Sequence, residues 1–357
     1  MKNCNQPKSV GVSIGSTSLL CFTPMMLYAL TFALAVQNQL LANGPTFFNR
    51  LLAAQPNIQP TSPAKSEQRQ EPQVVDSKQH DDLQLAIQKW ESDPTNPENL
   101  IWVGRRLAYL GRYQEAIEKF SLGIEQFPKD ARFLRHRGHR WITLREFDKA
   151  IEDLEAASEL IEETRDEVEP DGQPNAAGIP TSTLHTNVWY HLGLARFLKG
   201  DFEQALTAYQ RCLAAAKNDD MRVATIDWQY MTLRRLNRTD EAKALIAPIT
   251  PELKILENQA YHRRILMYRG LLQPSDLMPE PDAVFNPNRS LPVSDSQTAI
   301  NLATNGFGVG HWYLVNGDKK RAQEIFEAVI KGSSQAAFGF IAAEVELNRI
   351  TSPRSGK

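Results

Sequence analysis

The sequence predicts an all-α fold, an α-solenoid of helix–turn–helix repeats with additional C-terminal helices. The main observation is a period of 34 residues, at which Gly104 recurs as Gly138 and Ala116 as Ala150. A second observation is that apolar residues recur at helical spacing through most of the chain after residue 80. A period of this length is typical of helix pairs that bury their apolar faces only by stacking on neighbouring pairs.

The first 36 residues predict a signal peptide or a membrane anchor. Lys2 and Lys8 precede an uncharged apolar run over residues 19–36, and the sequence Ala-Leu-Ala at residues 33–35 offers a small-residue cleavage site. This layout is typical of a secretory signal, so we expect an exported protein, periplasmic or otherwise extracytoplasmic. The alternative is an uncleaved anchor, because this apolar run lies at the lower length limit for crossing a bilayer.

Residues 37–79 predict a disordered linker. The segment is rich in Pro, Gln and Ser, and almost no aromatic residue follows Phe48 within it. Such a composition cannot bury enough apolar surface to offset the entropy of ordering the chain. We expect a tether to the membrane or a flexible mature N-terminus.

Residues 80–249 predict the repeat array. In the first unit Gly104 stands where the two helices approach closely, Tyr113 opens the second helix and Phe120 fills the space between them. Small residues let helix axes approach, and an aromatic residue four positions after Ala116 shares its face. The register repeats from residue 131 and again in a third unit around Gly193. A degraded fourth unit ends near residue 249, and a short amphipathic helix over residues 83–90 precedes the array.

An insertion separates the second and third units. Ala205 lies 55 residues after Ala150, which is one period plus 21 residues. The surplus maps onto residues 164–184, which are rich in Pro, Gly and acidic residues and lack a helical period. We expect a surface loop there, and insertions of this kind often mark a binding face. A tolerated loop without a role is the alternative.

Residues 250–350 predict a C-terminal helical region that contains one further repeat-like unit. Helical spacing extends over residues 251–271, a proline-rich loop follows over residues 273–296, and Gly310, Ala322 and Phe326 then reproduce the spacing of the repeat. A closing helix is expected over about residues 335–348. The pattern leaves open whether these helices continue the solenoid or pack back on the array.

These patterns resemble the tetratricopeptide repeat (TPR). The resemblance is carried by Gly104-x-Arg106, by Trp189-x-x-Leu192-Gly193 and by the series from Gly310 through Phe326. It implies a right-handed α-solenoid that acts as a non-catalytic scaffold and binds a protein or peptide partner.

The whole layout is also similar to that of bacterial envelope adaptor lipoproteins built from such repeats. Those proteins have an exported N-terminus and a final repeat of the Leu-x-x-Gly-Asp type, which is matched here at residues 314–318. The resemblance implies an adaptor that recruits cell-wall hydrolases or proteases. No lipobox precedes Cys21, so attachment through a lipid is not implied.

No catalytic or metal chemistry is predicted. The formal net charge of −2 gives no general attraction to nucleic acid, and Cys212 is the one cysteine within the predicted fold. The sequence contains no phosphate-binding loop, nucleophile elbow or zinc motif. We therefore expect no enzyme activity, no cofactor and no metal, a surface role for His136 and His139, and a packing or groove-lining role for His311.

The first helices of the units are expected to line a concave surface, which we call the groove. Basic residues alternate there with apolar and aromatic ones, which suits an acidic peptide or a free C-terminal carboxylate. An ordinary solvated helix face is the alternative. The candidate partner-binding residues are Arg105, Tyr109, Arg132, Arg135, His139, Asn187, Tyr190, Phe197, Arg234 and Arg235, and Asp227 and Met231 are expected on the same face.

Two functions follow from these expectations. In the first, the chain is an exported scaffold that binds a protein or peptide in the groove. In the second, the repeats form a structural or oligomerising subunit of a larger envelope assembly, with the unit around Trp312 as the contact.

Overall fold

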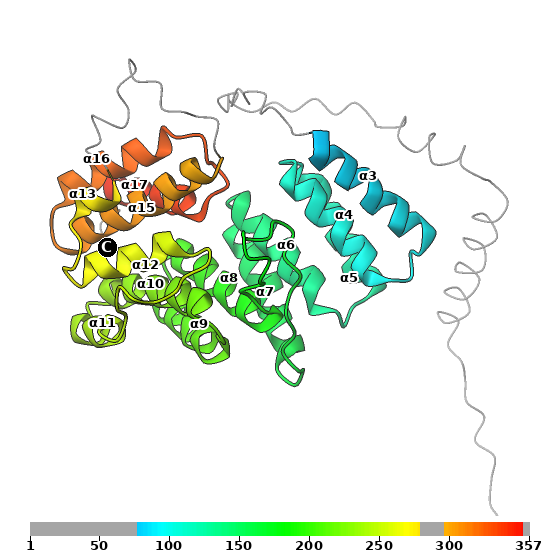
Figure 1. Cartoon of the computed structure of the whole chain (residues 1–357), viewed down its shortest axis with the longest axis horizontal. Coiled ribbons are helices and arrows are strands. Elements are labelled where there is room, and N and C mark those ends of the chain that lie inside the picture. Colours follow the sequence, from blue (N-terminus) through cyan, green and yellow to red (C-terminus); the bar gives the residue numbers. More distant parts are fainter. Residues whose placement is uncertain (1–76, 279–295, 353–357) are drawn as a thin grey trace, which may run out of the picture. The chain divides into compact units, whose positions relative to one another are not determined.

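The computed structural model describes residues 77–278 and 296–352, which form fourteen helices in succession (Figure 1). The helices are α3 (Ser77–Ser92), α4 (Pro97–Tyr109), α5 (Tyr113–Gln126), α6 (Ala131–Thr143), α7 (Phe147–Ile161), α8 (Leu184–Lys199), α9 (Phe202–Ala215), α10 (Asp219–Arg235), α11 (Thr239–Ile246), α12 (Gln259–Tyr268), α13 (Pro274–Leu277), α15 (Ser296–Val315), α16 (Lys319–Ile330) and α17 (Phe338–Thr351). The expected signal segment and linker lie outside the described residues.

The helices are arranged as stacked pairs. Each helix from α3 to α11 packs on the next one along the chain, and the first helices α4, α6, α8 and α10 also contact one another in turn. Within the described residues no strand is present, and the extended pairing is limited to an isolated bridge between Val168 and Thr183. The predicted all-α solenoid is confirmed, with its first helices side by side along the groove.

Local sequence explains where the helices begin. The aromatic residues at the expected positions, Tyr113, Phe147 and Phe202, are each the first residue of a second helix. The first helices begin at polar caps, as Asn96 Oδ1 accepts the backbone N–H of Glu98 at 3.0 Å. A cap of this kind satisfies one of the backbone donors that the first turn leaves unpaired.

Glycines in the first helices set the distance between the paired helices. Gly104 faces the ring of Phe120, and Gly193 faces the ring of Tyr209, so the aromatic residue of the second helix lies directly on the backbone of the first. The C-terminal pair repeats this arrangement with Gly310. The 34-residue echo therefore reports a packing contact, because a side chain larger than hydrogen would collide with the ring.

Gly193→Ala is expected to lower the free energy of unfolding by about 1–3 kcal/mol. An added Cβ would lie 2.6 Å from Tyr209 Cε1, a collision that outweighs the roughly 1 kcal/mol by which alanine favours a helix over glycine. Urea denaturation followed by circular dichroism measures the change. Tyr209→Leu in the same background makes room for the methyl group and should recover part of the loss. A Gly193→Ala chain as stable as the original would contradict the packing role.

Residues 162–183, which we call the insertion loop, connect α7 to α8 without a helix. This confirms the predicted insertion. The loop is braced at its base, where Leu184 N–H donates to the Glu167 carbonyl at 2.9 Å and Glu169 N–H donates to the Ser182 carbonyl at 3.2 Å. The two limbs of the loop therefore leave the array side by side.

The expected helical segment over residues 251–271 is wrong for its first part. α12 spans Gln259–Tyr268, and the preceding residues turn around the buried carboxylate of Asp220 at the start of α10. Its Oδ1 and Oδ2 accept the backbone N–H groups of Leu256, Glu257 and Asn258 at 2.9–3.2 Å. These hydrogen bonds replace a helical turn, and sequence periodicity does not report them.

The C-terminal helices pack back on the array. α15 contacts α12 and α10, α16 and α17 pack on α15, and Figure 1 shows the three C-terminal helices beside one another. The further repeat-like unit is confirmed as the pair α15 and α16, and the closing helix as α17. No helix of the described ranges is long and apolar enough to cross a membrane.

Candidate functional site

The groove is occupied by two segments of the chain itself. The insertion loop lies against α4, α6 and α8, and α17 lies against α6, α8 and α10 through its side chains. The ten candidate residues accordingly fall into three groups: those under the loop, those under α17, and those engaged elsewhere.

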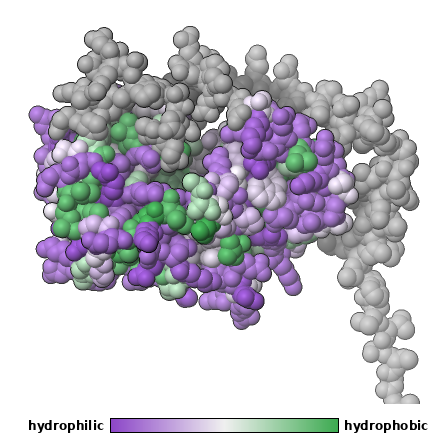
Figure 2. Space-filling model, in the orientation of Figure 1, coloured by the Kyte–Doolittle hydropathy of each residue, from purple (hydrophilic) through white to green (hydrophobic). Residues whose placement is uncertain are grey.

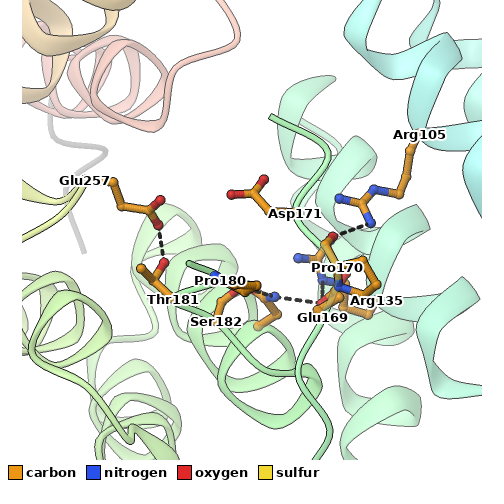
Figure 3. Close-up of a pocket in the computed structure, with 10 residues that line it drawn as sticks. Arg105, Arg135, Glu169, Pro170, Asp171, Pro180, Thr181, Ser182 and Glu257 are labelled. Atoms are coloured by element: carbon orange, nitrogen blue, oxygen red, sulfur yellow. Dashed lines mark hydrogen bonds and ion pairs between the residues drawn. The ribbon is translucent and has the colours of Figure 1, made fainter. Parts of the chain in front are cut away.

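The loop places one carboxylate in the N-terminal half of the groove. Glu169 is 7% exposed, and its Oε2 lies 3.2 Å from Arg135 Nε and accepts a hydrogen bond from Asn187 Nδ2 at 2.7 Å. His136 Nε2 lies 3.1 Å from the other oxygen, Oε1. Two first helices, α6 and α8, thus converge on a single acidic side chain (Figure 3).

The charges around Glu169 fix their own protonation states. Burial on its own would raise the pKa of Glu169, but Arg135 and His136 outweigh burial and hold that pKa well below its usual range. Burial, reinforced by Arg135, lowers the pKa of His136 to about 3. His136 is therefore neutral, and since its Nδ1 lies 2.8 Å from Arg135 Nη1, which only donates, the ring proton sits on Nε2 and faces Glu169.

Arg105 holds the loop by its backbone. Its Nη1 donates to the Pro170 carbonyl at 2.8 Å, its Nη2 donates to the Tyr109 hydroxyl at 3.2 Å, and its guanidinium lies 4.3 Å from the centre of the Trp102 ring. Among the described residues no carboxylate forms an ion pair with Arg105. In Figure 3 the side chain of Asp171 points away from Arg105, so its carboxylate does not neutralise that charge.

A third arginine extends this positive region. Arg140 lies over the Tyr113 ring at 5.6 Å, and no described carboxylate pairs with it. Burial and the nearby charges of Arg135 and Arg105 lower the pKa of Arg140 to about 10. Sequence analysis did not select Arg140, although its position 35 residues after Arg105 nearly keeps the repeat period and was the available signal.

A polar cavity of about 140 Å³ lies between the loop and the segment before α12. Arg105, Arg135 and Asp171 line one side, and Glu257 lines the other (Figure 3). Glu257 accepts hydrogen bonds from the Thr181 hydroxyl and from Asn175 Nδ2, so the far limb of the loop is tied to the C-terminal region. At roughly 30 Å³ per water, the cavity has room for a few solvent molecules or one acidic side chain.

α17 covers the other half of the groove. The ring of Phe338 lies 5.1 Å from that of His139 and 6.4 Å from that of Tyr190. Glu346, which is 1% exposed, pairs with Arg235 at 2.5 Å, and Arg349 Nη2 donates to the Leu198 carbonyl at 2.6 Å. This half of the groove is therefore filled by packed and paired side chains of the chain itself.

The remaining candidates do not face an open groove. Phe197 is fully buried and its ring packs on Trp228, so the expectation that it lines the groove is wrong. Arg132 pairs with Asp130 and Glu98 at 2.6 Å each, at the start of α6. Arg234 donates to the Val315 carbonyl at 3.0 Å, which ties α10 to the end of α15.

Other sequence expectations are also corrected. His136 is buried rather than exposed, whereas His311 packs among aromatic rings as expected. Asp227 and Met231 are fully buried because α12 and α15 cover that face of α10. Among the described residues no group of three or more His, Cys, Asp or Glu side chains could hold a metal ion.

Comparison with protein families matches residues 186–219, which span α8 and α9, to the tetratricopeptide repeat. These residues contain the Gly193–Tyr209 contact that the other helix pairs repeat. The chain is a tetratricopeptide repeat protein. No curated protein matches this TPR protein over its sequence.

Solved structures of other TPR proteins resemble this one at low sequence identity. A tetratricopeptide repeat protein from Parabacteroides merdae is 17% identical, covers 76% of this chain and 96% of its own, and has a TM-score of 0.41. YrrB, described as a TPR protein with an unusual peptide-binding site, is 13% identical over 74% of this chain and 98% of its own, with a TM-score of 0.38. MamA from Desulfovibrio magneticus RS-1 is 19% identical over 48% and 82% of the two chains, with a TM-score of 0.36.

Proposed function

We propose that this chain is a non-catalytic scaffold that binds an acidic segment of a protein or peptide partner through the N-terminal half of its groove. One observation carries the proposal. Arg105, Arg135 and Arg140 come together on α4 and α6, where the described residues supply a single buried carboxylate, Glu169. The site therefore has more positive than negative charge, although the whole chain is slightly acidic.

Physical chemistry favours a carboxylate ligand at such a site. Arginine holds carboxylates with two parallel hydrogen bonds, and these bonds strengthen where water is excluded. Trp102 and Tyr109 lie beside Arg105 and offer flat surfaces for the apolar part of a peptide. Figure 2 shows a largely hydrophilic face over α3–α5, with apolar side chains gathered in small groups elsewhere on that face. A charged partner segment fits these surroundings better than an apolar one.

We further propose that the partner is met outside the cytoplasm. Support comes from the sequence of residues 1–36, in which a basic start, an apolar run and a small-residue cleavage site follow one another. Determination of the N-terminal residue of the mature protein by mass spectrometry tests this location. Cleavage after the small residues at 33–35 would support export with release, and a retained apolar run in a membrane fraction would support an anchor.

Reversing the charge of Arg105 is expected to lower partner capture by at least about tenfold. A photo-crosslinking amino acid at position 102 captures the partner in cells that produce the full chain, and mass spectrometry identifies the product. Arg105→Glu places a carboxylate where the partner's own carboxylate would bind.

Arg222→Glu is the matched control, because Arg222 is exposed on α10 and no described residue pairs with it. Circular dichroism confirms that both variants are folded. Equal capture by the Arg105→Glu and Arg222→Glu chains would remove the groove as the binding site.

A further inference from the structure

The insertion loop binds the groove in the manner of a peptide ligand. Arg105 on α4 and Pro170 on the loop are 65 residues apart in sequence, so the loop reaches back over an entire repeat. Of residues 167–171, with the sequence Glu-Val-Glu-Pro-Asp, only Glu169 is buried, while Val168 is 62% exposed. One buried side chain with exposed neighbours is the pattern of an extended segment anchored at a single position, and it differs from the pattern of a core element.

The contacts of this segment are those expected of an acidic peptide. The carboxylate of Glu169 meets Arg135, His136 and Asn187, and the following carbonyl accepts a hydrogen bond from Arg105. Side-chain recognition and main-chain recognition therefore occur at adjacent positions. Gly172 continues the segment across Tyr109, where an added Cβ would collide with the Tyr109 ring.

The loop leaves part of the groove's charge unmatched. Arg105 bonds only to neutral oxygens, and Arg140 has no described carboxylate partner. A segment with a second carboxylate one or two positions after the first could pair with Arg105 as well as with Arg135. Such a segment would gain a charge-assisted bond that the loop does not make, and this gain provides a physical basis for displacing the loop.

We propose that residues 167–171 occupy the groove as an internal stand-in for the partner, and that the partner's binding segment carries a glutamate that replaces Glu169 in contact with Arg135 and Asn187. This proposal rests on the function proposed above and names the chemistry of its partner. Because the loop is tethered, its effective concentration is on the order of millimolar, and an external segment binds only when it competes with the loop. The loop thereby sets a threshold that weak or singly charged segments do not pass.

Glu169→Gln is expected to unmask the groove. The probe is a fluorescein-labelled peptide of residues 165–174, blocked at both ends, and binding to the full chain is measured by fluorescence polarisation. We expect the Glu169→Gln chain to bind this peptide at least about tenfold more tightly than the original chain does, because the internal competitor is weakened.

Glu167→Gln is the matched control, since Glu167 is exposed two residues earlier in the same loop and should leave peptide affinity at the original value. A peptide with glutamine in place of Glu169 should bind at least tenfold more weakly than the original peptide. Trypsin cleavage after Arg165 should be faster in the Glu169→Gln chain than in the Glu167→Gln chain, because the loop is released.

A second variant keeps the test decisive if Glu169→Gln does not fold. In it, residues 165–180 are replaced by a glycine-serine linker of the same length, which leaves the groove without its occupant. Failure of this folded variant to bind the peptide would overturn the proposal. Equal binding of the original and glutamine peptides would also overturn it.

The outcomes separate this inference from the proposed function. If the unmasked chain ignores the peptide while Arg105→Glu still abolishes partner capture, the loop is a brace and the scaffold function stands. If the unmasked chain binds the peptide while Arg105→Glu leaves capture intact, the groove recognises the loop and the partner binds at another site.

Discussion

Lowering the pH from 7.5 to 5.0 is expected to remove up to about 6 kcal/mol from the free energy of unfolding. Three buried histidines carry this effect. Burial lowers the pKa of His136 and that of His191 to about 3 each, and burial with nearby arginines holds the pKa of His311 well below its usual range. Each stays neutral in the folded chain while it takes up a proton in the unfolded chain below about pH 6.5.

The sign follows from proton binding. Where the unfolded state binds more protons, stability falls as pH falls, by up to about 1.4 kcal/mol per pH unit for each histidine, or about 2 kcal/mol each at pH 5. The stability is therefore fully present above pH 6.5 and decreases below it. The depressed pKa of Glu169 acts in the same direction, but only below its unfolded value of about 4.5. The histidines alone dominate between pH 5 and 6.5.

Urea denaturation at pH 7.5, 6.0 and 5.0 measures this loss. His311→Phe should flatten the pH dependence by about a third, because His311 is fully buried between the rings of Phe197 and Phe307 and has no described hydrogen-bond partner. His80→Gln is the control, since His80 is exposed on α3, and it should leave the slope unchanged. A free energy of unfolding that is constant between pH 7.5 and 5.0 would show that the buried histidines do not resist protonation.

Asp227→Leu is expected to lower the free energy of unfolding by about 3–5 kcal/mol. Asp227 Oδ2 lies 2.8 Å from Arg264 Nη2, and both side chains are fully buried between α10 and α12. Removing the carboxylate leaves a guanidinium in the interior, and arginine cannot lose its proton to escape that cost. Arg264 Nη1 also donates to the Thr304 carbonyl of α15 at 3.1 Å, so the same guanidinium joins three helices.

A double variant tests whether the loss comes from the unpaired charge. Asp227→Leu with Arg264→Met replaces both charges by apolar groups and should be more stable than Asp227→Leu alone. Arg263→Met, at the exposed neighbour of Arg264 on α12, is the control and should cost less than about 0.5 kcal/mol. Urea denaturation gives the three values. A double variant no more stable than the single one would show that packing, rather than charge, accounts for the loss.

Sequence periodicity located the helix pairs because it reports contacts between near neighbours. Gly104, Gly193 and Gly310 each face a ring of the following helix, and these contacts recur at nearly fixed spacing along the chain. Periodicity failed over residues 251–258, where three hydrogen bonds to Asp220 end the helical pattern that the apolar spacing suggested. A single distant carboxylate leaves no period in the sequence.

The groove candidates divided for the same reason. Arg105, Arg135 and Asn187 face the insertion loop, and the sequence held a signal for this contact in the acidic composition of residues 164–184 opposite a basic helix face. Phe197 and Asp227 lie in the interior, because α15 and α12 pack over the array. A helix face that would be exposed in an open solenoid becomes core when a later segment covers it.

The sequence by itself determined the stacking of helix pairs, since a small residue, an aromatic residue and a cap at fixed spacing are enough to specify each pair. Only the tertiary structure decided what the groove contains. Glu169 from the insertion loop and Phe338 from α17 reach it across long stretches of chain, through contacts that depend on the assembled array. Local spacing is written into each repeat, whereas the return of a distant segment depends on charge and shape that exist only after the repeats have stacked.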